Sequence, residues 1–443
     1  MARRVNAQVF WSVLAVGVAV ALLLLVMAIR PAQSAPAPAK MSDEFVNSIG
    51  IDTHVSFGGT PYDQYEAWKA KLGELGVKHV RDAAVDPNDK TVYSRYRDLY
   101  NTQGVKSTLN FSDDRRWSPT VTSSMVNNVL AASGNSVENF EGTNEPNNGS
   151  NPNWKQDTID YQRNLFNSVN ASSNPSIPVL NAPMKRPYEK KADGSVDFSA
   201  YPNLSAYSDW ANMHSYPAGN EPTGGNQDEQ LLFDNDIPMA QHVGGEGKPI
   251  TSTETGYENG PNTFNGISEQ ASAKYIPRLY FEYFNAGVKR THTYELIDSK
   301  TDPNGTTPQA HFGLLRYDLS EKPAFRALEN TIDILQDPGP SFKPGSLDYS
   351  LGGDTKNVHR TLLQKRDGSF YLVLWQEVPS YDRKAKRDLS VPSKRVTLTL
   401  NQPVKAANVY QPNRSVSQVE AYSAPKQIAL DVPDEVLVVK LTP

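Results

Sequence analysis

The chain has 443 residues, of which 38% are hydrophobic and 21% charged, as in a globular protein with a large core. This length predicts about two or three domains of roughly 150 residues each. The absence of cysteine excludes disulfides, thiol catalysis and thiolate metal sites. The seven histidines form no H-E-x-x-H pattern, which argues against a zinc hydrolase, and we expect neither a metal nor a cofactor.

The N-terminal segment predicts export. Arginines 3 and 4 precede an uncharged run over residues 10–29, which is long enough to cross a bilayer as a helix. Residues 1–30 are therefore either a long signal peptide, with a passable cleavage site at residues 32–34, or an uncleaved anchor, which the length of the run favours. In both cases we expect the body of the protein outside the cytoplasm, either membrane-anchored at the periplasmic or outer face or secreted.

Charge narrows the class of partner. The first 40 residues hold four of the 44 basic residues and no acidic residue, so the exported part carries 40 basic against 49 acidic groups. This net charge of −9 argues against nucleic acid or an anionic membrane surface as the partner. The membrane is expected as a partner only through the N-terminal segment, if it is uncleaved. Residues 31–45, rich in Ala and Pro, predict an extended linker to the globular part.

Short apolar runs then alternate with amphipathic stretches, which predicts a parallel sheet. One such stretch, residues 61–76, places Tyr65, Trp68 and Leu72 on one helical face and ends at Gly76. Eight strand–helix units over residues 46–337 match the size of a (β/α)8 TIM barrel. A doubly wound open sheet is the alternative, but the first run lacks the G-x-G-x-x-G loop. The eight predicted strands are 48–57, 77–84, 105–111, 137–146, 177–184, 210–217, 249–257 and 290–298.

The pattern changes at about Pro338. Two alternating apolar runs flank Asp367–Gly368, a strong hairpin signal, and three further alternating strands follow. Residues 338–443 therefore predict a small all-β, sandwich-like domain. It has no recognisable site of its own, so a stabilising cap is favoured over a carbohydrate-binding module.

In a TIM barrel the active site lies at the C-terminal ends of the strands. Only the fourth and seventh predicted strands end in a clear carboxylate followed by turn residues, at Glu145 and Glu254. Two carboxylates facing each other across a barrel mouth are the minimum for glycoside hydrolysis, in which one protonates the leaving oxygen and the other attacks the sugar or activates water. These two can come within about 5–5.5 Å, as a retaining enzyme requires.

Other strand ends supply candidates for substrate binding. Arg81 could lower the pKa of Glu254, although a salt bridge with Glu141 is the alternative. Asn144 is a candidate donor to a sugar hydroxyl or a turn former ahead of Pro146. The remaining candidates are expected to line the cleft: His54, His214, Tyr216 and Tyr294 near its centre, and Trp117 and Trp154 on loops of the same face, where aromatic rings stack on sugars.

Several of these motifs, in order, resemble those of clan A retaining glycoside hydrolases. "NFEGTNEPN" (139–147) is similar to the acid/base strand of that clan, "PITSTETGY" (249–257) to its nucleophile strand, "MHSYP" (213–217) to its sixth strand and "HVRDA" (79–83) to its second. "THTYELID" (291–298) and the segment after it resemble glycoside hydrolase family 39, as does the β-domain. The resemblance covers roughly residues 46–443.

The resemblance implies a retaining double displacement, with Glu145 as acid/base, Glu254 as nucleophile, Tyr216 beside the nucleophile and Glu141 as a buried structural carboxylate. Where many clan members place a tryptophan, this chain has Tyr294–Glu295, so the sugar stays open. The family includes endoglycosidases that act on bacterial exopolysaccharide, and a tethered exported barrel resembles these most, since tethering raises the effective concentration at the surface.

The partner is thus expected to be a polysaccharide or oligosaccharide. Three alternatives stay open: an exo-acting, xylosidase-like enzyme, a non-catalytic polysaccharide-binding barrel, and a barrel enzyme with metal-assisted chemistry. The shape of the barrel mouth separates the first from an endo-acting enzyme, since a groove favours endo action and a blind pocket exo action. The presence of both glutamates counts against the second, and no ligand cluster in the sequence supports the third.

Overall fold

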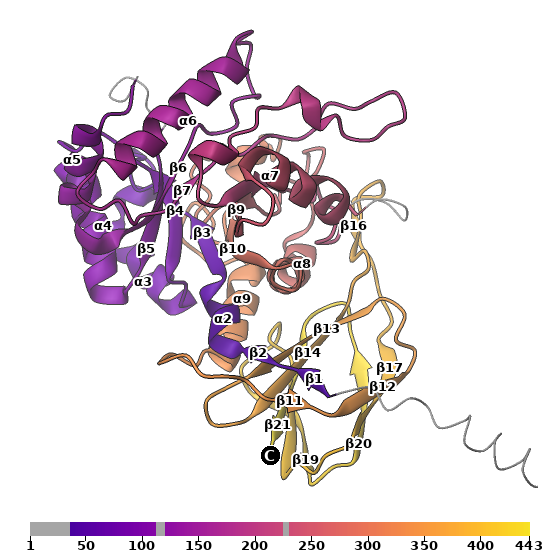
Figure 1. Ribbon diagram of the computed structural model, residues 1–443. Helices are drawn as coiled ribbons and strands as arrows, with labels where there is room; N and C mark the ends of the chain where they lie inside the picture. The colour runs from indigo at the N-terminus through magenta and orange to yellow at the C-terminus, as the bar shows by residue number, and fades with distance from the viewer. Residues whose placement is uncertain (1–35, 112–119, 225–229) are drawn as a thin grey trace, which may run out of the picture.

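The computed structural model describes residues 36–111, 120–224 and 230–443. Eight parallel strands form a barrel in the hydrogen-bonded order β7-β6-β5-β4-β3-β10-β9-β8 (Figure 1). A single parallel bridge between Leu180 and Trp210 joins the two ends of this order, so the barrel is nearly closed. The strands are β3 (Ile49–Asp52), β4 (His79–Ala83), β5 (Lys106–Asn110), β6 (Val137–Glu141), β7 (Val179–Leu180), β8 (Ala211–His214), β9 (Ile250–Thr255) and β10 (Val288–Thr293).

Helices follow seven of the eight strands and pack outside the barrel. The predicted helix over residues 61–76 is confirmed as α3, which buries Trp68 and Leu72 and ends at Gly76 in the left-handed conformation (φ 81°). The helices are α3 (Tyr65–Leu75), α4 (Lys90–Gln103), α5 (Ser123–Ser133), α6 (Trp154–Asn170), α7 (Ile237–Gly244), α8 (Glu269–Asn285) and α9 (Pro323–Leu335).

The fifth unit departs from the predicted strand–helix alternation. Residues 181–210, all of them described, contain no α-helix and only two short 3-10 turns, Phe198–Ala200 and Ser205–Tyr207. Prolines at 183, 187 and 202 interrupt this segment, and its apolar residues do not recur at helical spacing. The resulting long loop rises over the end of the barrel that carries the C-terminal ends of the strands (Figure 1).

The C-terminal domain is a β-sandwich, as predicted. A three-stranded sheet, β12-β17-β20, faces the larger sheet β19-β18-β21-β14-β13-β2. β13 and β14 form the predicted hairpin around Asp367–Gly368. The strands are β11 (Ser346–Leu347), β12 (Tyr349–Gly353), β13 (Val358–Gln364), β14 (Phe370–Gln376), β15 (Tyr381–Asp382), β16 (Arg387–Asp388), β17 (Lys394–Leu400), β18 (Ala406–Tyr410), β19 (Gln418–Ser423), β20 (Gln427–Val432) and β21 (Leu437–Thr442).

The described part of residues 31–45 is not the extended linker that the composition predicts. β1 (Ala37–Pro38) pairs with β11, and β2 (Lys40–Met41) pairs in parallel with β13, so both belong to the β-domain. α2 (Ser42–Asn47) then leads into the first barrel strand. Alanine and proline tolerate edge positions in a sheet, which explains how a linker-like composition forms edge strands.

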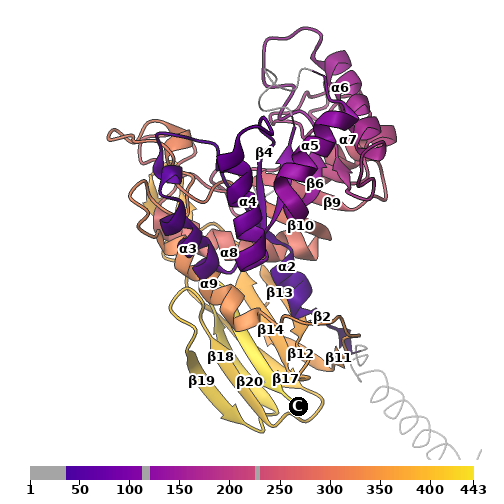
Figure 2. The same cartoon turned by 90° about the vertical axis from the view of Figure 1, so that its left-hand side faces the viewer.

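Buried ionic contacts join the two domains. Arg278 of α8 is fully buried, and its guanidinium donates to Glu377 of the β-domain (2.8 Å) and to the backbone oxygen of Asp434 (3.0 Å). Glu282, one helical turn further along α8, accepts from the Trp375 indole (2.8 Å). Breaking such a buried pair is costly, so the β-domain is held firmly against the barrel (Figure 2).

No helix within the described ranges is long and apolar enough to cross a bilayer. The segment on which we based the signal-or-anchor prediction, residues 1–30, lies outside these ranges.

Candidate active site

A cavity of about 750 Å³ opens at the C-terminal ends of the barrel strands. Its lining comes from loops that follow β6 to β10, together with the ends of β8 and β9. Six of the residues predicted from the sequence line it: Asn144, Glu145, His214, Tyr216, Glu254 and Tyr294. The structure therefore brings these predicted residues together around one cavity.

Glu254 is held rigidly. It is the fifth residue of β9, and its side chain is 11% exposed. Arg81 donates to one carboxylate oxygen (2.7 Å) and the Tyr216 hydroxyl donates to the other (2.7 Å). Burial and the Glu254 carboxylate raise the pKa of Tyr216 well above its usual range, so the hydroxyl keeps its proton. Both oxygens are thus fixed and the negative charge is stabilised where it faces the cavity.

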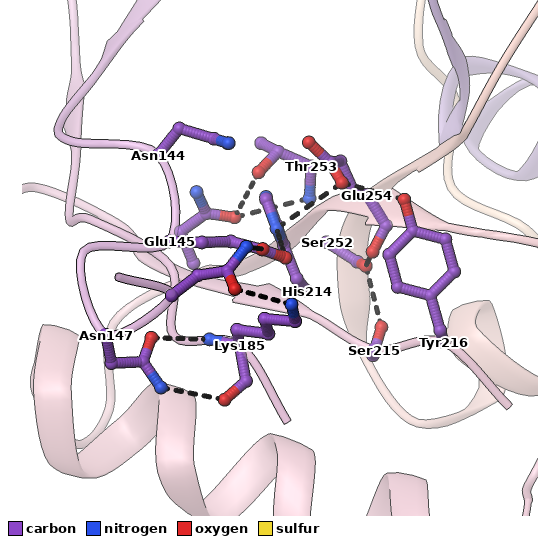
Figure 3. A network of polar contacts seen from close by, with 12 residues as sticks. Asn144, Glu145, Asn147, Lys185, His214, Ser215, Tyr216, Ser252, Thr253 and Glu254 are labelled. Carbon is purple, nitrogen blue, oxygen red and sulfur yellow. Dashed lines mark hydrogen bonds and ion pairs between the residues drawn. The ribbon is translucent and has the colours of Figure 1, made fainter. Parts of the chain in front are cut away.

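Glu145 lies on a loop instead of a strand. The predicted fourth strand ends at Glu141, four residues earlier than expected, and Glu145 adopts a positive φ of 39°. A non-glycine residue rarely takes this conformation, and such strain gathers at functional sites. The loop is fixed by two hydrogen bonds between the Asn147 side chain and the backbone of Lys185, both 2.8 Å (Figure 3).

His214 lies between the two carboxylates (Figure 3). Its Nδ1 is 2.9 Å from Glu145 Oε1 and 3.5 Å from Glu254 Oε2. Burial alone would lower the pKa of His214, but the two carboxylates outweigh it and the net shift is upward. Burial raises the pKa of Glu145, whereas the bond from His214 and the nearby Lys185 and Arg81 outweigh that effect and lower it. The two pKa shifts thus have opposite directions, and both favour a proton on the imidazole of His214 over one on the carboxyl group of Glu145.

The separation of these groups permits two kinds of chemistry. One ligand atom from each of Glu145, His214 and Glu254 lies within 4.8 Å of the other two, a donor set that a divalent cation can use. The same spacing brings the carboxylates within the approximately 5–5.5 Å expected when one is an acid and the other a nucleophile across a glycosidic bond. Two acid groups with distinct environments are the pattern from which such roles arise.

Arg81 is the centre of a buried charge cluster beneath the cavity. Besides Glu254, it donates to Glu141 (2.7 Å) and to the amide oxygen of Asn144 (2.7 Å). The two alternatives raised by the sequence, a partner for Glu254 and a salt bridge with Glu141, are thus both present. Asp52 lies 3.5 Å away, and burial raises its pKa well above the usual range although Arg81 opposes this. The bond to Asn144 fixes the orientation of an amide that faces the cavity.

Two predicted residues lie elsewhere. His54 does not line the cavity. Its ring stacks on Phe57 (4.3 Å between centroids) and pairs with Glu295 (3.1 Å). It also packs edge-to-face against Tyr294. Trp154 is the first residue of α6, is partly buried beside Tyr201 (6.2 Å between centroids) against a small core of the long loop, and does not line the cavity, so the structure favours loop packing over the predicted outer subsite. Trp117 lies outside the described residues.

The sequence did not reveal several lining residues. Lys185 and Arg186 directly follow the predicted fifth strand, residues 177–184, so the rule that catalytic groups follow barrel strands could have found them, although β7 itself ends at Leu180. Phe312 packs edge-on against Tyr216 and Tyr294, with centroids 5.6 and 5.4 Å away. It comes from the long segment between β10 and α9, which resembles family 39, but that resemblance did not single out Phe312 as a lining residue.

Comparison with protein-family models and with curated proteins gives no match. Solved structures are similar in fold. A family 39 glycoside hydrolase from Xanthomonas axonopodis pv. citri is 14% identical, with a TM-score of 0.57, covering 92% of this chain and 96% of that one. A monomeric β-xylosidase from Caulobacter crescentus is 15% identical (TM-score 0.57; 92% and 98% covered), and a glucosidase from Croceicoccus marinus is 11% identical (TM-score 0.59; 92% and 97%). At such identities the likeness establishes a shared fold, a TIM barrel with a β-domain.

Proposed function

We propose that the protein is a retaining glycoside hydrolase in which Glu254 is the nucleophile and Glu145 the acid/base. One observation carries this proposal: two carboxylates face each other across the barrel cavity, within 4.8 Å, in different environments. Glu254 is fixed through both oxygens on a strand, as a nucleophile requires. Glu145 lies on the opposite loop, where one carboxylate oxygen contacts the imidazole of His214, a group that can exchange a proton with it, and the other accepts a hydrogen bond from the Asn148 amide. The shared fold with family 39 glycoside hydrolases supports the same assignment.

The reaction follows from these positions. In the first step a Glu254 oxygen attacks the anomeric carbon while a proton passes through Glu145 to the leaving oxygen, which departs with the bonding electrons. In the second step Glu145 takes a proton from water, the hydroxyl attacks the same carbon, and the Glu254 carboxylate is released. The two inversions return the original anomeric configuration.

The proton for the first step is held by Glu145 and His214 together. The two carboxylates raise the pKa of the His214 imidazole, which favours the proton on His214 before the reaction begins. Transfer over the 2.9 Å contact places it on Glu145, next to the cavity. When Glu254 becomes a neutral ester, one of the charges that stabilise the imidazolium is lost. The pKa of His214 therefore falls, so His214 stays neutral in the second step while Glu145 acts as the base.

Replacing His214 by Asn is expected to move the basic limb of the pH profile of kcat/KM to lower pH. The proton that Glu145 delivers is shared with His214, whose pKa is raised, so the pair keeps this proton to higher pH than Glu145 can alone. We expect kcat to fall about 10- to 100-fold as well. His54→Asn is the control, since His54 pairs with Glu295 outside the cavity, and its basic limb should not move. A basic limb that stays in place or moves to higher pH in His214→Asn would contradict this role.

For the substrate, we infer endo action on a bacterial exopolysaccharide. The catalytic cavity adjoins a second cavity of about 1350 Å³, with Gly219 and Phe264 lining both, which favours a long ligand. Exo action is the second candidate, because similar structures include a β-xylosidase and a glucosidase.

A product profile separates the two modes of action. We expect the purified protein to shorten polymers in a panel of xylan, glucomannan and the source organism's exopolymer, with oligosaccharides as first products. Proton NMR of fresh products should show the anomer of the substrate. Release of only monosaccharides from 4-nitrophenyl glycosides would establish exo action, and an inverted anomer would refute the double displacement.

We also propose that the protein acts outside the cytoplasm, anchored or secreted through residues 1–30. The uncharged run at residues 10–29 supports this. Fractionation of cells that express the chain with and without residues 1–35 tests it, because an anchor should move the full chain to the membrane fraction. Recovery of both forms from the cytosol would refute the proposal.

A further inference from the structure

The second cavity lies where the barrel meets the β-domain. Its volume of about 1350 Å³ exceeds the approximately 300–1,000 Å³ typical of a site for one small ligand. Polar groups from both domains line it, among them Asn220 and Glu221 of the loop after β8 and Asn357, Tyr381 and Asp382 of the β-domain. Such a wall of amide, carboxyl and hydroxyl groups suits a ligand that offers hydroxyl groups at regular intervals.

Phe264 stands at the boundary of the two cavities and is 86% exposed, the highest value among the exposed large hydrophobic residues described. Because this exposed ring lines both cavities, it offers an apolar face to a ligand that extends from one cavity into the other. Gly219 is the other residue that lines both cavities. Its φ of +81°, and a backbone oxygen 2.7 Å from where a Cβ would lie, allow the two loops to meet closely there.

A hairpin of the β-domain holds the Phe264 loop in place. β15 and β16 form this hairpin, which reaches up to the loops near α7 and α8 (Figure 1). Arg383 at its turn donates to Asn220 (3.1 Å) and Asn265 (2.7 Å), and its guanidinium lies 5.8 Å from the Phe264 ring. Lys386 donates to the backbone oxygen of Thr263 (2.6 Å). Hydrogen bonds from the β-domain hairpin thus hold the residues on either side of Phe264, Thr263 and Asn265.

We propose that the second cavity binds the part of a polysaccharide chain that extends beyond the catalytic cavity, with Phe264 as a stacking platform and the β-domain hairpin as the wall of the groove. The inference rests on the proposed glycoside hydrolase activity and specifies its substrate as a polymer of several sugars. The ring offers a flat apolar face to a pyranose, and the polar lining accepts its hydroxyl groups. The β-domain then contributes directly to substrate binding.

The test compares substrates of different length. For Phe264→Ala we expect kcat/KM on polymer, and on an oligosaccharide ladder made from it, to fall about three- to tenfold more than on a 4-nitrophenyl monoglycoside. Arg383→Ala should also lower kcat/KM more on the polymer than on the monoglycoside, but by a smaller factor than Phe264→Ala. Tyr317→Ala is the matched control, since this ring is also exposed (40%) but lines neither cavity, and it should change neither value.

Affinity electrophoresis gives a readout that does not require hydrolysis. In gels containing xylan, glucomannan or the source organism's exopolymer, Glu254→Gln should be retarded by at least one polymer, and the double variant with Phe264→Ala should migrate faster. Equal mobility in every gel, together with equal loss on long and short substrates, overturns the inference while the proposed function stands. Polymer hydrolysis that persists in Glu254→Gln overturns the proposed function instead.

Discussion

Glu254→Gln is expected to lower kcat by about three to five orders of magnitude while the fold survives. The amide cannot form the glycosyl ester, yet it keeps the volume of the carboxyl group and can still accept a hydrogen bond from Tyr216. Circular dichroism and the thermal transition should match those of the unchanged protein. Mass spectrometry of the active protein with a slow fluorinated substrate should find the sugar attached to Glu254. An adduct on another residue would contradict the assignment.

Glu145→Gln should produce a loss of similar size, but one that depends on the leaving group. Substrates with a good leaving group need little protonation, so kcat/KM on a dinitrophenyl glycoside should fall far less than on a polymer. Azide should rescue Glu145→Gly by attacking the glycosyl enzyme in place of activated water, giving a glycosyl azide. Full activity of either Gln variant would refute the pairing.

Arg81→Met should combine the largest expected loss of stability with a loss of activity. The guanidinium pairs with the buried carboxylates of Glu141 and Glu254, both at 2.7 Å, and lies 3.5 Å from the buried carboxyl group of Asp52. Removing one member of a buried ion pair costs about 3–5 kcal/mol of unfolding free energy, because the partner charge stays buried without compensation. Denaturant unfolding monitored by tryptophan fluorescence measures this loss, and kcat should fall with it because Glu254 loses a donor.

Two matched variants separate the contributions at Arg81. Arg81→Lys keeps the charge but cannot bond to Glu141 and Glu254 at once, so we expect an intermediate loss of stability. Tyr216→Phe removes one donor to Glu254 without removing a charge, so activity should fall with little change in unfolding free energy. If Arg81→Met proved as stable as the unchanged protein, the buried carboxylates would have to be protonated and the cluster would need another explanation.

The sequence predicted the catalytic end of the barrel because the strand-end rule is geometric. Glu254 is the fifth residue of β9 and His214 the last residue of β8, so both lie at the C-terminal ends of their strands, where the rule places catalytic groups. Glu145 was found for a less secure reason, since β6 ends four residues earlier and the loop conformation, not the strand, aims the carboxylate. Propensity carries no information about a non-glycine residue with positive φ, which tertiary contacts hold in place.

Features that depend on distant contacts could not be predicted. Trp154 follows the fourth strand as an outer subsite should, but the loop over residues 181–210 covers it, and nothing near Trp154 in sequence indicates that loop. The hairpin that fixes Phe264 bonds to residues more than one hundred positions away, such as Arg383 to Asn220. Composition suggested a linker at residues 37–41, where pairing with β11 and β13, some 300 residues later, forms strands instead.

That pairing also determines which way the molecule faces. The described chain begins at Pro36 in the β-domain, and α2 leads from there to the N-terminal end of β3, on the side of the barrel opposite the cavity. Figures 1 and 2 show β1, β2 and the C-terminus at that same pole. A chain held to a surface through residues before Pro36 therefore points its catalytic opening outward, away from the point of attachment. Under the proposed anchoring and endo action, this orientation places the cleavage site on the far side of the enzyme from its point of attachment.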